Sequence, residues 1–147
     1  MQTRTVYRSI AGQQMLVSAP PETPVVDAAR AMTRANCGSI LVLDHDGELL
    51  GIVTERDFMT RVIARAHDPA HTTLAQVMTR HPICVSPETP VAEAVVLMIE
   101  RGFRHLPIVN RNGRILGVFS SRDALPPEID TAVSFAAFHQ EMNDALS

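Results

Sequence analysis

Lysine is absent from the chain, and all 13 basic residues among its 147 residues are arginine. Without lysine there is no Walker A lysine, no Schiff-base lysine and no Ser–Lys dyad, so enzymes that depend on these groups are excluded. The formal net charge is −3, and no arginine-rich run is present. Nucleic-acid binding usually leaves a basic footprint, so the sequence argues against a nucleic-acid partner.

Cysteine and long apolar runs are also scarce. Cys37 and Cys84 are the only cysteines, and the first ten residues contain no long apolar core. We therefore expect a mature chain in a reduced, cytoplasmic setting and no disulfide scaffold. No apolar run approaches the roughly 20 residues that a membrane-spanning helix needs, so we expect no membrane partner.

The pentapeptide PETPV occurs twice, at 21–25 and at 87–91, an offset of 66 residues. With this offset, residues 21–57 align with residues 87–123 without a gap, and 12 of the 37 pairs are identical. A fixed period is typical of repeated structural units. The sequence therefore predicts one internal duplication.

Each copy is expected to begin its first helix inside PETPV. Thr23 and Thr89 are in the position of an N-cap, with Pro24 and Pro90 at the first helical position. Apolar residues then recur at the i, i+3, i+4, i+7 spacing of one buried helical face. They are Val25, Ala28, Ala29 and Met32 in the first copy, and Val91, Ala94, Val95 and Met98 in the second. Asn36 and Gly102 tolerate the left-handed conformation that ends many helices.

Two strands are expected after that helix in each copy. They are SILVLD and ELLGIVT in the first copy, and HLPIVN and RILGVFS in the second. Asp46-Gly47 and Asn112-Gly113 separate them, and such pairs predict a type I′ hairpin. A second helix begins near Glu55 or Ser121, and MLVSA or PICVS supplies a first strand before PETPV. Each copy is thus strand–helix–strand–strand–helix, a fold of the α/β (α+β) class.

The remaining segments complete the predicted organisation. We expect a first repeat at 10–66, a second repeat at 76–125, an N-terminal segment at 1–9, a linker at 67–75 and a C-terminal helical tail at 126–147. The segment TVYRSIA at 5–11 resembles TTLAQVM at 72–78. The offset between these two segments is 67 residues, so they are one residue out of register with the 66-residue repeat. Apolar residues at helical spacing in the tail predict an amphipathic helix that packs on the body or on a partner subunit.

The most specific motif is Gly-x-x-(Thr/Ser)-x-Arg-Asp, present as GIVTERD at 51–57 and as GVFSSRD at 117–123. The hydroxyl residue of the motif, Thr54 or Ser120, lies at the start of a helix, where free backbone N–H groups attract phosphate. The following carboxylate can accept both hydroxyls of a ribose, and the arginine can neutralise phosphate charge. These residues are Asp57, Asp123, Arg56 and Arg122. One copy alone would favour an ordinary N-cap, but two copies in register reverse that preference and favour a ligand site.

The whole repeated unit resembles a tandem pair of cystathionine-β-synthase (CBS) domains, or Bateman module, over about residues 10–125. The resemblance rests on PETPV and on the Gly-x-x-(Thr/Ser)-x-Arg-Asp motif, each present twice. It implies two pseudo-symmetric repeats packed sheet to sheet, with clefts that bind AMP, ADP, ATP, NAD or S-adenosylmethionine. It also implies a stand-alone regulatory module that acts as a homodimer on an unknown partner and performs no catalysis.

The resemblance assigns site residues position by position. Asp57 and Asp123 would hold ribose, and Thr54 and Ser120 would reach phosphate or ribose. The entry to the middle strand would line each cleft, with Cys37, Gly38 and Ser39 in one copy and Phe103, Arg104 and His105 in the other. Backbone at the first strand would cradle adenine, at Met15 to Val17 in one copy and at Thr79 to Ile83, including Pro82, in the other.

Other functional classes remain to be weighed against a ligand-sensing module. A structural dimerisation module with degenerate clefts needs neither the paired carboxylates nor the paired hydroxyls. An enzyme would need a catalytic domain, for which no residues remain. His105 has no second ligand at metal spacing, and Asp68-Pro69 interrupts the stretch that holds His67 and His71, so no metal site is expected.

Overall fold

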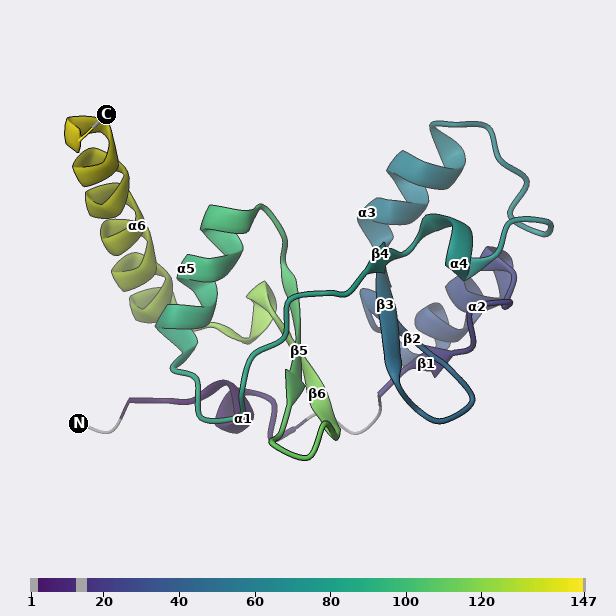
Figure 1. Ribbon diagram of the computed structural model, residues 1–147, viewed down its shortest axis with the longest axis horizontal. Coiled ribbons are helices and arrows are strands. Elements are labelled where there is room, and N and C mark those ends of the chain that lie inside the picture. The colour runs from purple at the N-terminus through teal and green to yellow at the C-terminus, as the bar shows by residue number, and fades with distance from the viewer. Residues whose placement is uncertain (1–2, 13–15, 147) are drawn as a thin grey trace. The chain divides into compact units, whose positions relative to one another are not determined.

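The computed structural model describes residues 3–12 and 16–146 and divides the chain into two compact units (Figure 1). One unit is Gln14–Pro82, and the other combines Met1–Gln13 with Ile83–Ser147. The N-terminal segment therefore packs with the second repeat, although the first repeat follows it in the chain. Predicted features at Met15 lie outside the described residues.

The unit Gln14–Pro82 is a four-stranded sheet with helices. Its sheet has the order β1-β2-β3-β4, in which β1 is parallel to β2 and the other pairs are antiparallel. Its core joins α2 to the sheet through fully buried residues such as Ile40, Val53 and Leu74. The elements are β1 (Ser18–Ala19), α2 (Val25–Ala35), β2 (Ser39–Leu43), β3 (Leu49–Thr54), α3 (Glu55–Asp57), η1 (Phe58–Ile63), α4 (Leu74–Val77) and β4 (Thr79–Arg80).

The other unit is built on an antiparallel pair of strands, β5 and β6, covered by helices. Phe119, Leu106 and Ile108 are fully buried in its core. The elements are α1 (Val6–Ser9), α5 (Val91–Arg101), β5 (His105–Val109), β6 (Ile115–Ser120), η2 (Ser121–Asp123) and α6 (Pro126–Leu146). The mixed fold with two related repeats, predicted from the duplication, is confirmed.

The first strand differs between the repeats because of one proline. In the first repeat the Leu41 N–H donates to the Val17 carbonyl at 2.9 Å, next to the parallel pairing of β1 with β2. Pro107 occupies the equivalent position in the second repeat and has no N–H to donate. There the strand expected in PICVS is reduced to a single bridge between Val85 and Ile108.

The starts of α2 and α5 lie one residue later than predicted. Pro24 and Pro90 are themselves the N-caps, without a side-chain cap, so the predicted threonine caps were wrong. The free N–H groups at each start are instead satisfied by distant backbone. The Val25 N–H donates to the Thr72 carbonyl at 2.8 Å, and the Val91 N–H donates to the Arg4 carbonyl at 3.0 Å.

The same contacts correct the register between the N-terminal segment and the linker. Thr5 bridges Pro90 as Thr73 bridges Pro24. The two threonines are 68 residues apart and the two prolines 66, so the segment TVYRSIA is two residues out of register and not one. Each short helix, α1 or α4, begins directly after its threonine and adds to the core of its unit.

Helix ends and hairpins depend on residues with positive φ. Asn36 and Gly102 end α2 and α5 in the left-handed conformation, as predicted. Gly47 and Gly113 each have a φ of 81°, but Asp46 does not have positive φ, whereas a type I′ turn requires it at both central residues. The hairpin type was therefore wrong, and each loop turns with a single left-handed glycine.

The second helix of the second repeat is only the 3₁₀ turn η2. Ala124 is extended, and Leu125 precedes two prolines. A residue before proline is disfavoured in the helical region, so the chain leaves the helix here and begins α6 at Pro126. In the first repeat, α3 continues directly into η1.

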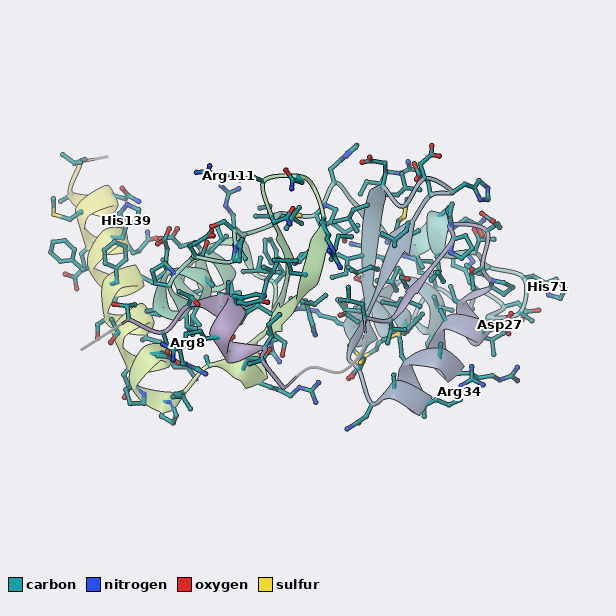
Figure 2. All side chains as sticks on the ribbon, turned by 90° about the horizontal axis from the view of Figure 1, so that it is seen from below. Arg8, Asp27, Arg34, His71, Arg111 and His139 are labelled. Carbon is teal, nitrogen blue, oxygen red and sulfur yellow. The ribbon has the colours of Figure 1, made fainter. Side chains whose placement is uncertain are left out.

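The tail forms the helix predicted for it, and α6 runs alongside α5 (Figure 1). Ala132 of α6 is fully buried in the core of this unit. His139 points from α6 (Figure 2) and its Nδ1 lies 2.9 Å from Glu100 Oε1 on α5. Packing on the body, one of the two predicted arrangements, is thus confirmed. Among the described residues, no helix is long and apolar enough to cross a membrane.

Candidate functional site

The turn after β3 is a closed capping box. The Thr54 N–H donates to Asp57 Oδ2 at 2.9 Å, and the Asp57 N–H donates to Thr54 Oγ1 at 3.3 Å. The Asp57 side chain is only 14% exposed, so its carboxylate is held in one orientation. An ionised carboxylate has about four acceptor positions, and this one therefore keeps capacity for a ligand hydroxyl.

The start of the middle strand lies beside this turn. Ser39 is paired with Thr54 across β2 and β3, and the Glu55 N–H donates to the Gly38 carbonyl at 3.1 Å. Ser39 is 8% exposed, which makes it one of the few buried polar residues. The predicted residues Gly38, Ser39, Thr54 and Asp57 are therefore brought together within one unit.

The second repeat reproduces this arrangement. The Ser120 N–H donates to Asp123 Oδ2 at 2.8 Å, and the Ser120 hydroxyl lies 3.3 Å from the same oxygen. His105 is paired with Ser120, and the Ser121 N–H donates to the Arg104 carbonyl at 3.2 Å. Arg104 and His105 lead into β5 beside this turn, at the positions that Gly38 and Ser39 occupy in the first repeat.

Arg61 contacts the first turn and was not among the predicted site residues. Its Nε lies 3.6 Å from Asp57 Oδ1, and its Nη1 donates to the Val77 carbonyl at 2.8 Å. The guanidinium thus connects the Asp57 carboxylate to α4. A spacing of i, i+4 on a helix brings side chains together, so this pair was visible in the sequence.

Arg4 contacts the second turn from the N-terminal segment. Its Nη2 donates to the Asp123 carbonyl at 2.7 Å and to Glu128 Oε1 at 2.6 Å, and its Nε donates to Glu128 Oε2 at 3.1 Å. The bidentate pair raises the pKa of Arg4 and lowers that of Glu128, chiefly through the side-chain hydrogen bonds between them. The contact joins residues 124 positions apart, and no sequence signal indicated it.

The other predicted residues have mixed environments. Arg56, Arg122 and Thr79 are exposed, and Phe103 packs against the core of its unit. The Val17 carbonyl accepts from Leu41, Pro82 ends one unit, and Ile83 begins a segment of the other. Cys37 lines an open hollow of about 330 Å³ with Ala29, Met32, Thr33, Asn36, Glu55 and Phe58. This hollow lies beside α2 and includes neither Thr54 nor Asp57.

The ion pair of Arg4 and Glu128 gives a pH-dependent prediction. The folded pKa of Glu128 is below its ordinary value of 4.5, so the pair stabilises the fold above that pH and ceases to do so as the pH falls through the folded pKa. We expect Glu128→Gln to lower the free energy of unfolding by about 0.5–1 kcal/mol at pH 7. Urea unfolding at pH 7 and below pH 4 measures this, and a difference that stays constant with pH would contradict it.

Comparison with known proteins gives one family. The model described as "CBS domain" matches residues 13–64 and 74–126. The uncharacterised protein MK0525 of Methanopyrus kandleri is 33% identical over 119 residues, which are 81% of this chain and 60% of that protein. The chain thus spans about three fifths of that relative. It spans 18% of the CBS domain-containing protein CBSCBSPB2 of Arabidopsis thaliana, at 42% identity over 65% of this chain.

Solved structures share the fold. The CBS domain protein PAE2072 of Pyrobaculum aerophilum, complexed with AMP, has a TM-score of 0.77 at 23% identity and covers 89% of this chain and 99% of its own. The CBS domain pair of protein MJ0100, in complex with 5′-methylthioadenosine and S-adenosyl-L-methionine, has a TM-score of 0.73 at 22% identity, with 83% and 93% covered. At these identities the likeness concerns the fold.

Proposed function

Because the chain belongs to the CBS domain family and carries two such domains, we propose that it is a regulatory module that binds adenosyl ligands. AMP, ADP, ATP, NAD and S-adenosylmethionine are the candidates. Ligand binding would change a homodimer in the cytoplasm, and a partner protein would respond to that change without any catalysis by this chain.

The main support is the pair of fixed carboxylates at Asp57 and Asp123. Each is oriented by a backbone N–H at 2.8–2.9 Å from the start of its own turn. A carboxylate fixed in this way can accept the hydroxyl groups of a ribose, and the adjacent Thr54 or Ser120 offers a hydroxyl. The AMP and S-adenosyl-L-methionine complexes of PAE2072 and MJ0100 are consistent with an adenosyl ligand.

The two sites are proposed to differ. Arg104 and His105 flank Asp123, whereas Gly38 and Ser39 flank Asp57. Because Arg104 and His105 are basic, they favour a ligand with more phosphate charge at the second repeat. At the first repeat, Arg61 already lies 3.6 Å from Asp57 Oδ1 and is placed to contact a ligand phosphate or to compete with a ribose hydroxyl.

The alternative function is a structural dimerisation module. One exposed apolar surface favours self-association under both the sensing and the structural proposal. Met59 and Ile63 on η1 are 57% and 72% exposed. Exposed apolar residues that gather on one element often mark an interface. Met59 and Ile63 are therefore one candidate surface for the proposed homodimer, with or without a ligand.

The test is the melting temperature with each of the five ligands in turn. A ligand at 100 times its Kd adds about 2.7 kcal/mol to stability, which raises the melting temperature by several degrees. We expect such a shift with at least one ligand and recovery of that ligand unchanged. If none of the five shifts the melting temperature, the structural alternative replaces the sensing proposal; turnover of a ligand would make the chain an enzyme.

Two substitutions then assign the sites. Asp57→Asn and Asp123→Asn keep an oxygen for the turn but remove the charge, and each is expected to weaken ligand binding at its own repeat by about 10-fold or more. Asp27→Asn is the matched control, because Asp27 is an exposed residue on α2 far along the chain from both turns (Figure 2). Unchanged affinity in both site variants, measured by calorimetry, would refute the ribose assignment.

A further inference from the structure

One side of α6 carries a row of large apolar side chains that are exposed in the described part of the chain. Phe135, Phe138 and Met142 are 55%, 61% and 47% exposed, and Leu146 at the end of the helix is 82% exposed. Tail residues 127–147 lie beyond the ranges matched by the family model, 13–64 and 74–126. We call these four residues the α6 stripe.

The stripe lies beside the face of α6 that packs on α5, and the ring centroids of Phe135 and His139 are 5.9 Å apart where the two meet. Ala132 and His139 lie on the packed face, where Ala132 is buried and His139 contacts Glu100. At 100° per residue, the centre of the stripe lies about 65° around the helix from the centre of that face. The spacing of three and then four residues from Phe135 to Met142 is that of a seam between two packed helices.

We propose that the α6 stripe is an interface between two copies of this chain, formed by two α6 helices that pair across a twofold axis. The inference rests on the self-association proposed above and names the surface that carries it. In an antiparallel pair centred near Phe138, each Phe135 meets the Met142 of the second copy, so the stripe is complementary to itself.

The size of the stripe supports a second copy as its occupant. A large apolar or aromatic side chain covers roughly 150–250 Å², and the four are on average about 60% exposed, so the stripe presents roughly 400–600 Å² per copy. Interfaces are about 57% apolar, so this corresponds to roughly 800 Å² per partner when surrounding polar atoms are included. That is the standard size for a stable protein complex.

The charges on α6 are consistent with this pairing. Asp130, Glu141 and Asp144 lie on α6, and the helix contains no arginine. These carboxylates lie about 100° or more from the centre of the stripe, so they stay in solvent in the paired arrangement. An acidic helix is repelled by anionic lipid, which disfavours a membrane surface as the occupant.

The test is the mass of the full chain in solution, measured by sedimentation over a range of micromolar concentrations. Wild type is expected at twice the chain mass or more, and Phe138→Glu is expected to at least halve that mass. The double variant Phe135→Ser/Phe138→Ser should do the same without adding charge. Val133→Glu is the matched control, because Val133 is 52% exposed on the opposite side of the same helix and should leave the mass unchanged.

Other outcomes overturn the inference and separate it from the proposed function. A monomeric wild type, or a Phe138→Glu variant with the wild-type mass, would refute the α6 interface. If Ile63→Glu alone dissociates the chain, self-association occurs through η1 and the α6 inference is wrong while the proposed homodimer stands. Ligand binding is read separately by the melting-temperature shift, which the Phe138→Glu monomer should retain in part.

Discussion

Phe119→Ala is expected to lower the free energy of unfolding by about 3–5 kcal/mol, which is a large part of the stability of a domain of this size. Phe119 is fully buried on β6 and is the largest such side chain among the described residues. Its ring fills the space between the β5–β6 pair and α5, and truncation leaves a cavity that close-packed neighbours fill only in part.

Urea unfolding followed by circular dichroism measures this loss. Tyr7→Ala is the matched control, because Tyr7 is an aromatic residue of the same unit that is 53% exposed. We expect its effect to be within about 0.5 kcal/mol, as for most surface substitutions. Equal losses for the two variants would show that Phe119 does not have the packing described for it.

Gly51→Val is expected to destabilise the unit Gln14–Pro82 by about 3 kcal/mol, the upper end of the range for overpacking. A Cβ at Gly51 would lie 2.7 Å from the Thr79 carbonyl oxygen and 2.7 Å from Met78 Sδ. The methionine can move, but the carbonyl belongs to β4, which pairs with β3 at Gly51 and Arg80. The substitution should therefore separate β4 from the sheet.

Hydrogen exchange and thermal unfolding together test this result. We expect faster exchange of the amides in β4 and a lower melting temperature for Gly51→Val. Gly12→Ala is the control, because a Cβ at Gly12 has no neighbour within 4 Å. Normal protection of β4 in the Gly51→Val variant would contradict the close approach on which the prediction depends.

The duplication made the fold and much of the candidate site predictable. Asn36 and Gly102 occupy equivalent positions in the two repeats. Each ends its helix through its own backbone preference, so the sequence around it was enough to predict the helix end. The turns at Thr54 and Ser120 could be recognised for the same reason, since every atom of a capping box lies within four residues. Their pairing with Ser39 and His105 followed from two strands joined by a short hairpin.

The features that were missed depend on contacts between distant parts of the chain. The helix starts at Pro24 and Pro90 are shifted because backbone from Thr72 and Arg4 supplies the acceptors. The contact of Arg4 with Asp123 requires the N-terminal segment to pack with the second repeat, which no local pattern specifies. Pro107 is an exception, because a missing N–H is visible in the sequence and could have predicted the weakened first strand.

The packing of residues 1–13 with residues 83–147 has a consequence for synthesis on the ribosome. The unit Gln14–Pro82 is continuous in the chain and can close as soon as it has emerged. Val6 and Ile10 are made earlier, but the core that buries them includes Phe119 and Ala132 near the other end of the chain. These two apolar side chains must therefore stay exposed to chaperones until the residues up to Ala132 have been translated.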